Sequence, residues 1–122
     1  MKNNQLMIYG AYGYAGELMV REAVAQGLRP IIAGRDDEKL KPIATELSLE
    51  CRAFGVRNTG SNLQDISVLL NCAGPFSATA EPLARACLAQ QIHYLDITGE
   101  IDIFRKCHAL DEDCLLYTSP SP

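Results

Sequence analysis

Apolar residues along the 122-residue chain occur in two kinds of pattern. Short, continuous apolar runs are typical of strands that are buried on both faces of a sheet. Between them lie longer stretches in which apolar residues recur every three or four positions, as they do on one face of a helix. The continuous runs predict strands over residues 5–9, 29–34, 50–56, 68–72 and 92–98.

The intervening stretches predict helices over residues 14–26, 36–47, 79–91 and 100–112. The apolar face of the first helix is expected to hold Leu18, Val20, Ala23 and Val24. Gly27 should end this helix, because glycine readily adopts the left-handed conformation that follows many helices. Pro42 lies inside the second helix and should move its start later or kink it. Pro82 should lie in the first turn of the third helix, where proline is tolerated.

Strands that alternate with helices predict an α/β fold with a parallel sheet and helices on both faces. Residues 1–113 form one expected domain. Residues 114–122, "CLLYTSPSP", break the pattern, and we expect them to be a disordered or artefactual tail. Ligands of such sheets bind beyond the carboxyl ends of the strands. The candidate functional residues are therefore those that directly follow each strand.

Three glycines lie three positions apart in "IYGAYGYAGELMV", where the first strand meets the first helix. Gly10 allows a tight turn, Gly13 lets a pyrophosphate approach the backbone, and Gly16 lets the helix pack close to the sheet. The helix N-terminus offers free N–H groups to the phosphates. The spacing G-x-x-G-x-x-G differs from the usual G-x-G-x-x-G. Together with the alternating elements, the motif predicts a Rossmann-type doubly wound sheet that binds a dinucleotide.

The second strand ends in "AGRDDEKL", which bears on the choice of cofactor. An acidic residue about 20 positions after the glycines would bind the ribose hydroxyls of NAD. Arg35 occupies that place, and a guanidinium group suits the 2′-phosphate of NADP. Asp36 follows directly and keeps NAD as the alternative, with Arg35 then a solvated surface charge. NADP is the cofactor that we expect.

Polar residues also follow the fourth and fifth strands. The fourth ends in "NCAGPF", beside the glycine turn, where adenosine and the central ribose would lie. Asn71 either contacts the ligand or only holds this turn. The fifth strand ends in "HYLDITGE", toward the nicotinamide end, where Asp96 either contacts substrate or caps local structure. The sequence leaves both pairs of alternatives open.

Composition narrows the class of protein. The net charge of −4 gives no basic surface for nucleic acid, and no apolar stretch is long enough to span a membrane. Five cysteines without a C-x-x-C pair argue for reduced thiols in the cytoplasm. Cys72 and Cys87 lie in apolar runs and should be core residues. His93 and His108 lack partners at metal-ligand spacing, so no metal site is expected.

The motifs "YGAYGYAG", "AGRDDEKL", "VLLNCAGPF" and "YLDITGE" together resemble the N-terminal NADP-binding domain of the saccharopine dehydrogenase-like family. That family includes saccharopine reductases and trans-acting enoyl reductase-like proteins. The resemblance covers roughly residues 6–110 and implies a two-domain oxidoreductase. This domain would hold the dinucleotide for hydride transfer. A second domain, absent after this point, would bind a small-molecule substrate, so the chain would be truncated before it.

The resemblance also implies which residues bind the cofactor. Those expected at the pyrophosphate and the 2′-phosphate are Gly10, Tyr12, Gly13, Tyr14, Ala15, Gly16 and Arg35. Those expected beside adenosine and ribose are Asn71, Cys72, Ala73 and Gly74. Catalytic residues stay unassigned, because the family's substrate domain lies outside this sequence. A homodimer is left open.

Two rival interpretations share parts of this pattern. Short-chain dehydrogenases share a glycine-rich first turn and an N-x-A-G motif, but they need Tyr-x-x-x-Lys for proton transfer. No tyrosine in this chain has a lysine four residues later. A non-catalytic NAD(P)-binding sensor on the same fold stays open as the alternative function.

Overall fold

Five parallel strands form one sheet in the computed structural model, which describes residues 5–73 and 76–96. The strands are β1 (Leu6–Tyr9), β2 (Ile31–Gly34), β3 (Cys51–Ala53), β4 (Val68–Asn71) and β5 (His93–Asp96). Their order across the sheet is β3-β2-β1-β4-β5. The order reverses between β1 and β4, which is where doubly wound sheets bind ligands. The predicted fold class is therefore confirmed.

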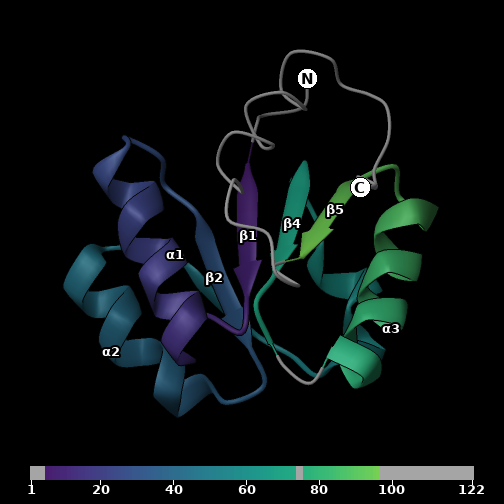
Figure 1. Cartoon of the computed structure of the whole chain (residues 1–122), viewed down its shortest axis with the longest axis horizontal. Coiled ribbons are helices and arrows are strands. Elements are labelled where there is room, and N and C mark those ends of the chain that lie inside the picture. The colour runs from purple at the N-terminus through teal and green to yellow at the C-terminus, as the bar shows by residue number, and fades with distance from the viewer. Residues whose placement is uncertain (1–4, 74–75, 97–122) are drawn as a thin grey trace.

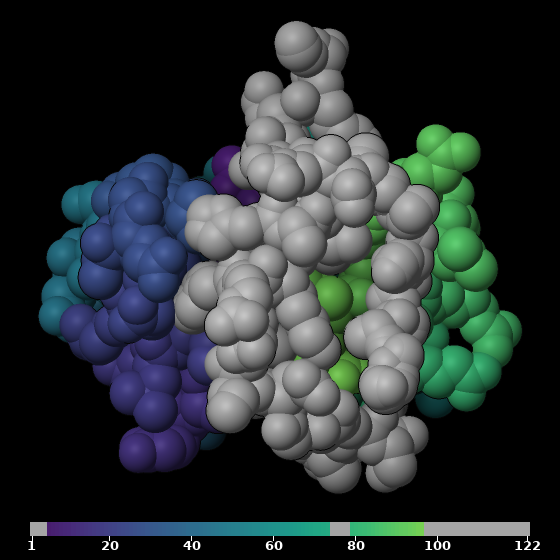
Figure 2. All heavy atoms as spheres, turned by 45° about the horizontal axis from the view of Figure 1, so that its top comes forward, coloured from purple at the N-terminus to yellow at the C-terminus, as the bar shows by residue number. Residues whose placement is uncertain are grey.

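Helices cover both faces of the sheet. They are α1 (Tyr14–Ala25), α2 (Asp37–Leu47) and α3 (Phe76–Ala89), with 3₁₀ turns η1 (Val56–Asn58) and η2 (Gly60–Asn62). Figure 1 shows α1 and α2 on one face and α3 on the other, and Figure 2 shows the same separation in the packed atoms. The turn η1 lies against α3 and helps to cover the second face. Among the described residues, no helix is long and apolar enough to cross a membrane.

The two faces of the sheet bury separate sets of side chains. On β1, Leu6 and Ile8 pack with residues of α1 and α2, whereas Met7 and Tyr9 pack with residues of α3. All four are buried, as the continuous apolar run predicted for a central strand. Cys87 of α3 is also fully buried in the second set, so it is the core residue that the sequence indicated.

The end of α1 agrees with the sequence prediction. Gly27 has a φ of +91°, and its N–H donates to the carbonyl of Val24. The N–H of Leu28 reaches back to the carbonyl of Ala23, which completes a Schellman motif. The expected place of Leu18 in the core was wrong, since its side chain is 51% exposed. The residues that this helix does bury are Gly16, Val20 and Ala23.

Pro42 and Pro82 both lie inside helices. The helix α2 begins at Asp37, so Pro42 does not delay its start. The Asp36 side chain accepts the N–H of Glu38 and caps the helix, which favours this start. The helix α3 begins at Phe76, three residues before the expected position, so Pro82 lies beyond its first turn. The expected helix over residues 100–112 lies outside the described residues.

Candidate functional site

A pocket of about 360 Å³ opens at the carboxyl ends of the central strands. Its lining comes from the ends of β1, β2 and β4, from the glycine loop, from η1 and from α3: Tyr9, Gly10, Tyr12, Gly13, Gly34, Arg35, Val56, Cys72, Ala73 and Thr79. Because the sheet order reverses between β1 and β4, the chain leaves these strands toward helices on opposite faces of the sheet, and this leaves space at their carboxyl ends. The pocket thus lies where the strand pattern placed a ligand.

Two of the three glycines are required by packing. Gly10 has a φ of +84°, and a Cβ on it would lie 2.7 Å from the backbone nitrogen of Ala73. The loop after β1 therefore touches the loop after β4. A Cβ on Gly16 would overlap the carbonyl oxygen of Gly10, so α1 starts directly against the end of β1. These contacts bring the N-terminus of α1 to the pocket.

Packing does not explain why the remaining glycine of this motif, Gly13, lacks a side chain. A Cβ there would meet only the Gly10 carbonyl oxygen, at an ordinary 3.6 Å, and its φ of −74° suits any residue. Gly13 is the N-cap of α1 and supplies no side-chain cap. The first N–H groups of the helix are therefore left for another acceptor. A bare backbone at the pocket wall, with free N–H groups behind it, fits a phosphate.

Tyr12 joins the glycine loop to the loop after β2. Its ring lies on Gly34, where an added Cβ would come within 2.6 Å of the ring's Cε2 atom. Its hydroxyl accepts the backbone N–H of Asp36 at 3.2 Å. Tyr12 therefore fixes the position of the segment that carries Arg35.

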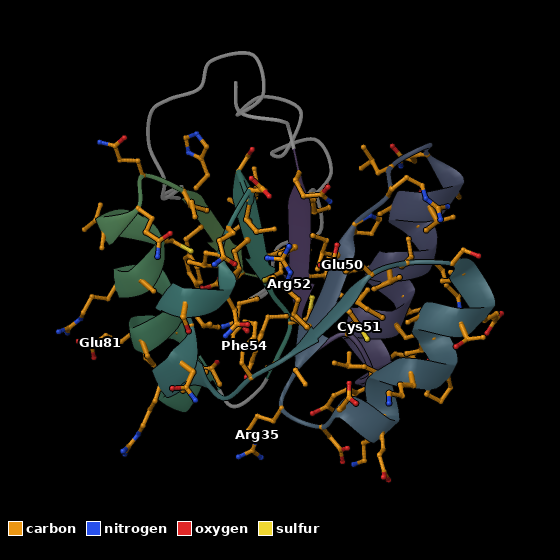
Figure 3. All side chains as sticks on the ribbon, turned by 180° about the vertical axis from the view of Figure 1, so that it is seen from behind. Arg35, Glu50, Cys51, Arg52, Phe54 and Glu81 are labelled. Carbon is orange, nitrogen blue, oxygen red and sulfur yellow. The ribbon has the colours of Figure 1, made fainter. Side chains whose placement is uncertain are left out.

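Arg35 lines the pocket and is exposed. Figure 3 shows its side chain extending outward from the loop after β2. Within the part of the chain that the structure describes, Arg35 has no ion-pair partner, although other cations do: Arg21, Lys41, Arg52 and Arg85. The neighbouring Asp36 accepts the N–H of Glu38 at 3.0 Å. The arginine is thus available to an anionic ligand, whereas the carboxylate already caps a helix.

Asn71 is fully buried at the end of β4. Its side-chain oxygen accepts the N–H of Ala73 at 2.9 Å, and its amide nitrogen donates to the hydroxyls of Thr79 and Tyr94. The Thr79 hydroxyl donates to the Ala73 carbonyl, and the Tyr94 hydroxyl donates to Asp96. Asn71 therefore holds the turn that forms one wall of the pocket.

The floor of the pocket is also fixed by hydrogen bonds. The Tyr9 hydroxyl donates to the carbonyl of Phe54 at 2.9 Å, and the two rings lie 5.1 Å apart. This contact reaches from β1 past β2 to the segment after β3. Burial raises the pKa of the Tyr9 hydroxyl above its usual value, so the hydroxyl stays protonated as a donor.

Cys72 is a buried part of the wall and not a reactive thiol. Burial raises its pKa to about 12, so the neutral form predominates near neutral pH. Burial is also the main reason why the Tyr94 pKa is raised, although the hydrogen bond from Asn71 acts in the opposite direction. Neither group is set up as a nucleophile or a base.

Most of the expected site residues meet in this pocket. Those on its lining are Gly10, Tyr12, Gly13, Arg35, Cys72 and Ala73. Those near it but not on its lining are Tyr14, Ala15, Gly16 and Asn71. Gly74 lies outside the described residues. Four lining residues were not expected: Tyr9, Gly34, Val56 and Thr79. Tyr9 and Gly34 end their strands, which is a signal that the sequence contains.

These features fit a phosphorylated dinucleotide. The free N–H groups of α1 and the bare backbone of Gly13 suit a pyrophosphate, and Arg35 suits a further phosphate at one end. Val56 and Ala73 supply apolar surface to the same pocket. The phosphates of the dinucleotide would be held by backbone N–H groups and by the cationic side chain of Arg35.

Comparisons with known proteins identify the family of this chain. A sequence model of the family described as "Saccharopine dehydrogenase NADP binding domain" matches residues 6–117. The human saccharopine dehydrogenase-like oxidoreductase is 25% identical over 78% of this chain and 27% of its own length. A Mycobacterium tuberculosis protein named as a trans-acting enoyl reductase is 25% identical over 83% of this chain and 28% of its own. The chain therefore spans about a quarter of these relatives' length.

A solved structure shows the same fold. The apo saccharopine dehydrogenase (L-Glu forming) from Saccharomyces cerevisiae superposes with a TM-score of 0.69 at 11% identity, over 85% of this chain and 24% of that one. The family model covers nearly the whole described structure, and it confirms the resemblance seen in the four motifs. The chain accordingly belongs to the saccharopine dehydrogenase NADP-binding domain family, and NADP is its cofactor.

Proposed function

We propose that this domain holds NADP(H) for an oxidoreductase whose substrate is bound by a second domain. When bound, the nicotinamide supplies the hydride chemistry. The N-terminus of α1 binds the pyrophosphate, Gly13 gives it room, and Arg35 binds the 2′-phosphate. Asn71 keeps the wall after β4 in place. The observation that carries the proposal is the open, uncapped N-terminus of α1 at the pocket.

The relatives support an enzymatic role. The human relative is named an oxidoreductase and the mycobacterial one a reductase, and each is much longer than this chain. Their additional length gives room for a substrate domain. Among the described residues that line the pocket, the buried, protonated thiol of Cys72 and the hydrogen-bonded hydroxyl of Tyr9 do not supply an obvious acid or base. Substrate protonation is therefore assigned to the second domain.

The thiols also support a reducing compartment. Cys51, Cys72 and Cys87 are free in the structure, and the last two are buried. Free buried thiols are ordinary in proteins of the cytoplasm, where disulfides are rare. We place the protein there as part of the same proposal.

Titration of the 122-residue chain with NADPH, followed by calorimetry, tests the cofactor assignment. Gly13→Val places a branched side chain where the pyrophosphate must approach, and we expect affinity to fall at least about tenfold. Gly60→Val is the matched control, because Gly60 lies in η2 and an added Cβ would meet only the Gln90 side chain, at 3.6 Å. Both variants should keep the circular-dichroism spectrum of the wild type. Unchanged NADPH affinity in Gly13→Val would contradict the assignment.

The location of the chemistry is tested by activity. The 122-residue chain should bind NADPH without oxidising it in the presence of saccharopine-type or enoyl-type substrates. Turnover by this chain alone would show that the reacting groups lie within it. Binding without turnover by a longer protein that includes the following segment would favour a sensor over an enzyme.

A further inference from the structure

A second cation lies beside the pocket, on the first turn of α2. The ammonium group of Lys39 lies over the Tyr12 ring, 5.6 Å from its centroid, and Tyr12 lines the pocket. Lys39 is exposed and, among residues 5–73 and 76–96, has no ion-pair partner. Arg35 directly follows β2, and Lys39 lies in the first turn of α2, so the two cations are separated by only the cap residue and the first two residues of the helix.

We propose that Lys39 is a specificity-determining residue that binds the 2′-phosphate of NADP(H) together with Arg35. This inference rests on the proposed function of the pocket. A phosphate monoester carries a charge of about −1.5 to −2 at neutral pH, because its second pKa is near 6. Arg35 alone offsets one of these charges. The second requires another cation within reach, and Lys39 supplies it.

The nearby acidic side chains leave Lys39 available. Asp36 is occupied as the cap of α2, and Asp37 forms an ion pair with Lys41 at 3.2 Å. The two lysines of this helix therefore have different partners. Within the described part of the chain, Lys41 is paired with a carboxylate, whereas Lys39 contacts an aromatic ring that belongs to the pocket wall.

Tyr12 acts as the platform for this lysine. Its ring is fixed by packing on Gly34 and by the hydrogen bond from the N–H of Asp36. Tyr12 is half-buried, and a cation over such a partly exposed ring is held weakly, so the ammonium group can move from the ring to a phosphate when one arrives. The long apolar stem of lysine can remain on the ring while its charged end moves.

Calorimetric titration of the 122-residue chain with NADPH and with NADH tests the proposal, since the two cofactors differ only in the 2′-phosphate. Lys39→Met and Lys41→Met each remove one positive charge from the same helix. We expect Lys39→Met to weaken NADPH binding about three- to tenfold, as for a charge-assisted hydrogen bond at a partly exposed site. Its NADH affinity should stay within about twofold of the wild type, as should both affinities of Lys41→Met.

A second variant keeps the test independent of helix stability. Tyr12→Leu removes the platform but retains Lys39, and it should lower the preference for NADPH by a smaller factor. An equal loss of NADPH affinity in Lys39→Met and Lys41→Met would mean that only general charge matters, and this would overturn the proposal. Unchanged NADPH preference in Lys39→Met would overturn it as well, while the proposed function would stand. Failure of the wild type to bind either cofactor would overturn both.

Discussion

The side-chain amide of Asn71 donates a hydrogen bond of 3.0 Å to the hydroxyl of Tyr94, which lies on the neighbouring strand β5. Asn71 is opposite Asp96 in the register of these two strands, and the Tyr94 hydroxyl also donates to that carboxylate. The pair therefore ties the ends of β4 and β5 together directly beside the pocket. Loss of this hydrogen bond should lower the stability of the protein and weaken ligand binding.

Asn71→Leu should lower the free energy of unfolding by about 2–3 kcal/mol. Leucine has a similar size but leaves the N–H of Ala73 and the hydroxyl of Tyr94 without their present partner. Tyr94→Phe removes a single hydroxyl and should cost only about 1 kcal/mol. Urea unfolding of both variants measures the difference. Equal losses would mean that Asn71 does not hold the turn through its several bonds.

Gly16→Ala should destabilise the protein by about 1–3 kcal/mol, because its Cβ would overlap the carbonyl oxygen of Gly10 and force α1 away from the sheet. Gly13→Ala is the matched variant in the same motif. Its φ of −74° and open surroundings predict a stability within about 0.5 kcal/mol of the wild type. Thermal unfolding separates the two. A large loss in Gly13→Ala would show that this glycine is structural.

Arg35→Ala should remove most of the preference for NADPH over NADH, chiefly by weakening NADPH. A hydrogen bond to a charged group contributes about 1.5–3 kcal/mol, which corresponds to at least about tenfold in affinity. The preference of the wild type should also weaken at high salt, since part of the attraction is screened. Titration of both cofactors at two salt concentrations measures these effects. NADPH affinity that is the same with and without the Arg35 side chain would reject its role.

Asp36→Ala gives the complementary result. The carboxylate caps α2, so its removal should cost about 1 kcal/mol of stability. If Asp36 instead bound the ribose of NAD, this variant would lose NADH affinity most. We expect NADH affinity to change little. Only the stability, measured by urea unfolding, should fall.

Stability should fall at alkaline pH because of two buried thiols. Burial raises the pKa of Cys72 and of Cys87 to about 12. Unfolded thiols ionise near pH 8.5, so above that pH the unfolded state releases protons that the folded state retains. Their contribution to the free energy of unfolding is complete below about pH 8.5. Above that pH, it decreases by up to about 1.4 kcal/mol per pH unit for each thiol.

Cys87→Ala should remove the part of this decrease of stability with pH that one thiol contributes. Urea unfolding between about pH 8 and 9 measures this slope, below the pH at which ordinary tyrosines, with a pKa near 10, ionise appreciably. The variant starts from a lower stability because it loses buried volume, but its pH dependence should be shallower. An unchanged slope would show that Cys87 is more accessible in the folded protein than its burial indicates.

Most strands could be predicted because central strands of a parallel sheet are continuous apolar runs, as β1 and β4 are. The start of α3 could not, since small and polar residues around Ser77 and Thr79 carry no helical pattern. Residues 50–56 read as one strand, yet the chain turns into η1 at Val56 after Gly55. Local pattern locates buried segments, whereas their ends depend on tertiary contacts.

The same distinction applies to the site. Gly10, Gly13 and Arg35 were predicted because their chemistry follows from their place after a strand. Val56 and Thr79 were missed, because η1 and α3 bring them to the pocket from other parts of the chain. The role of Asn71 was left open, since an amide can serve a ligand or a turn equally well. Its hydrogen bond to the N–H of Ala73 shows that it holds the turn.

The hydrogen bond from Tyr9 to the carbonyl of Phe54 has a consequence for the thermodynamics of binding. It joins β1 to the segment after β3 beneath the pocket, so the floor is preorganised before a nucleotide arrives. A ligand that meets such a floor orders few side chains, and the entropic penalty of association is correspondingly small. Mutation of Tyr9 to phenylalanine would remove this hydrogen bond and loosen the floor. It would therefore weaken nucleotide binding by raising the entropic penalty, even though the hydroxyl bonds to the protein and not to the ligand.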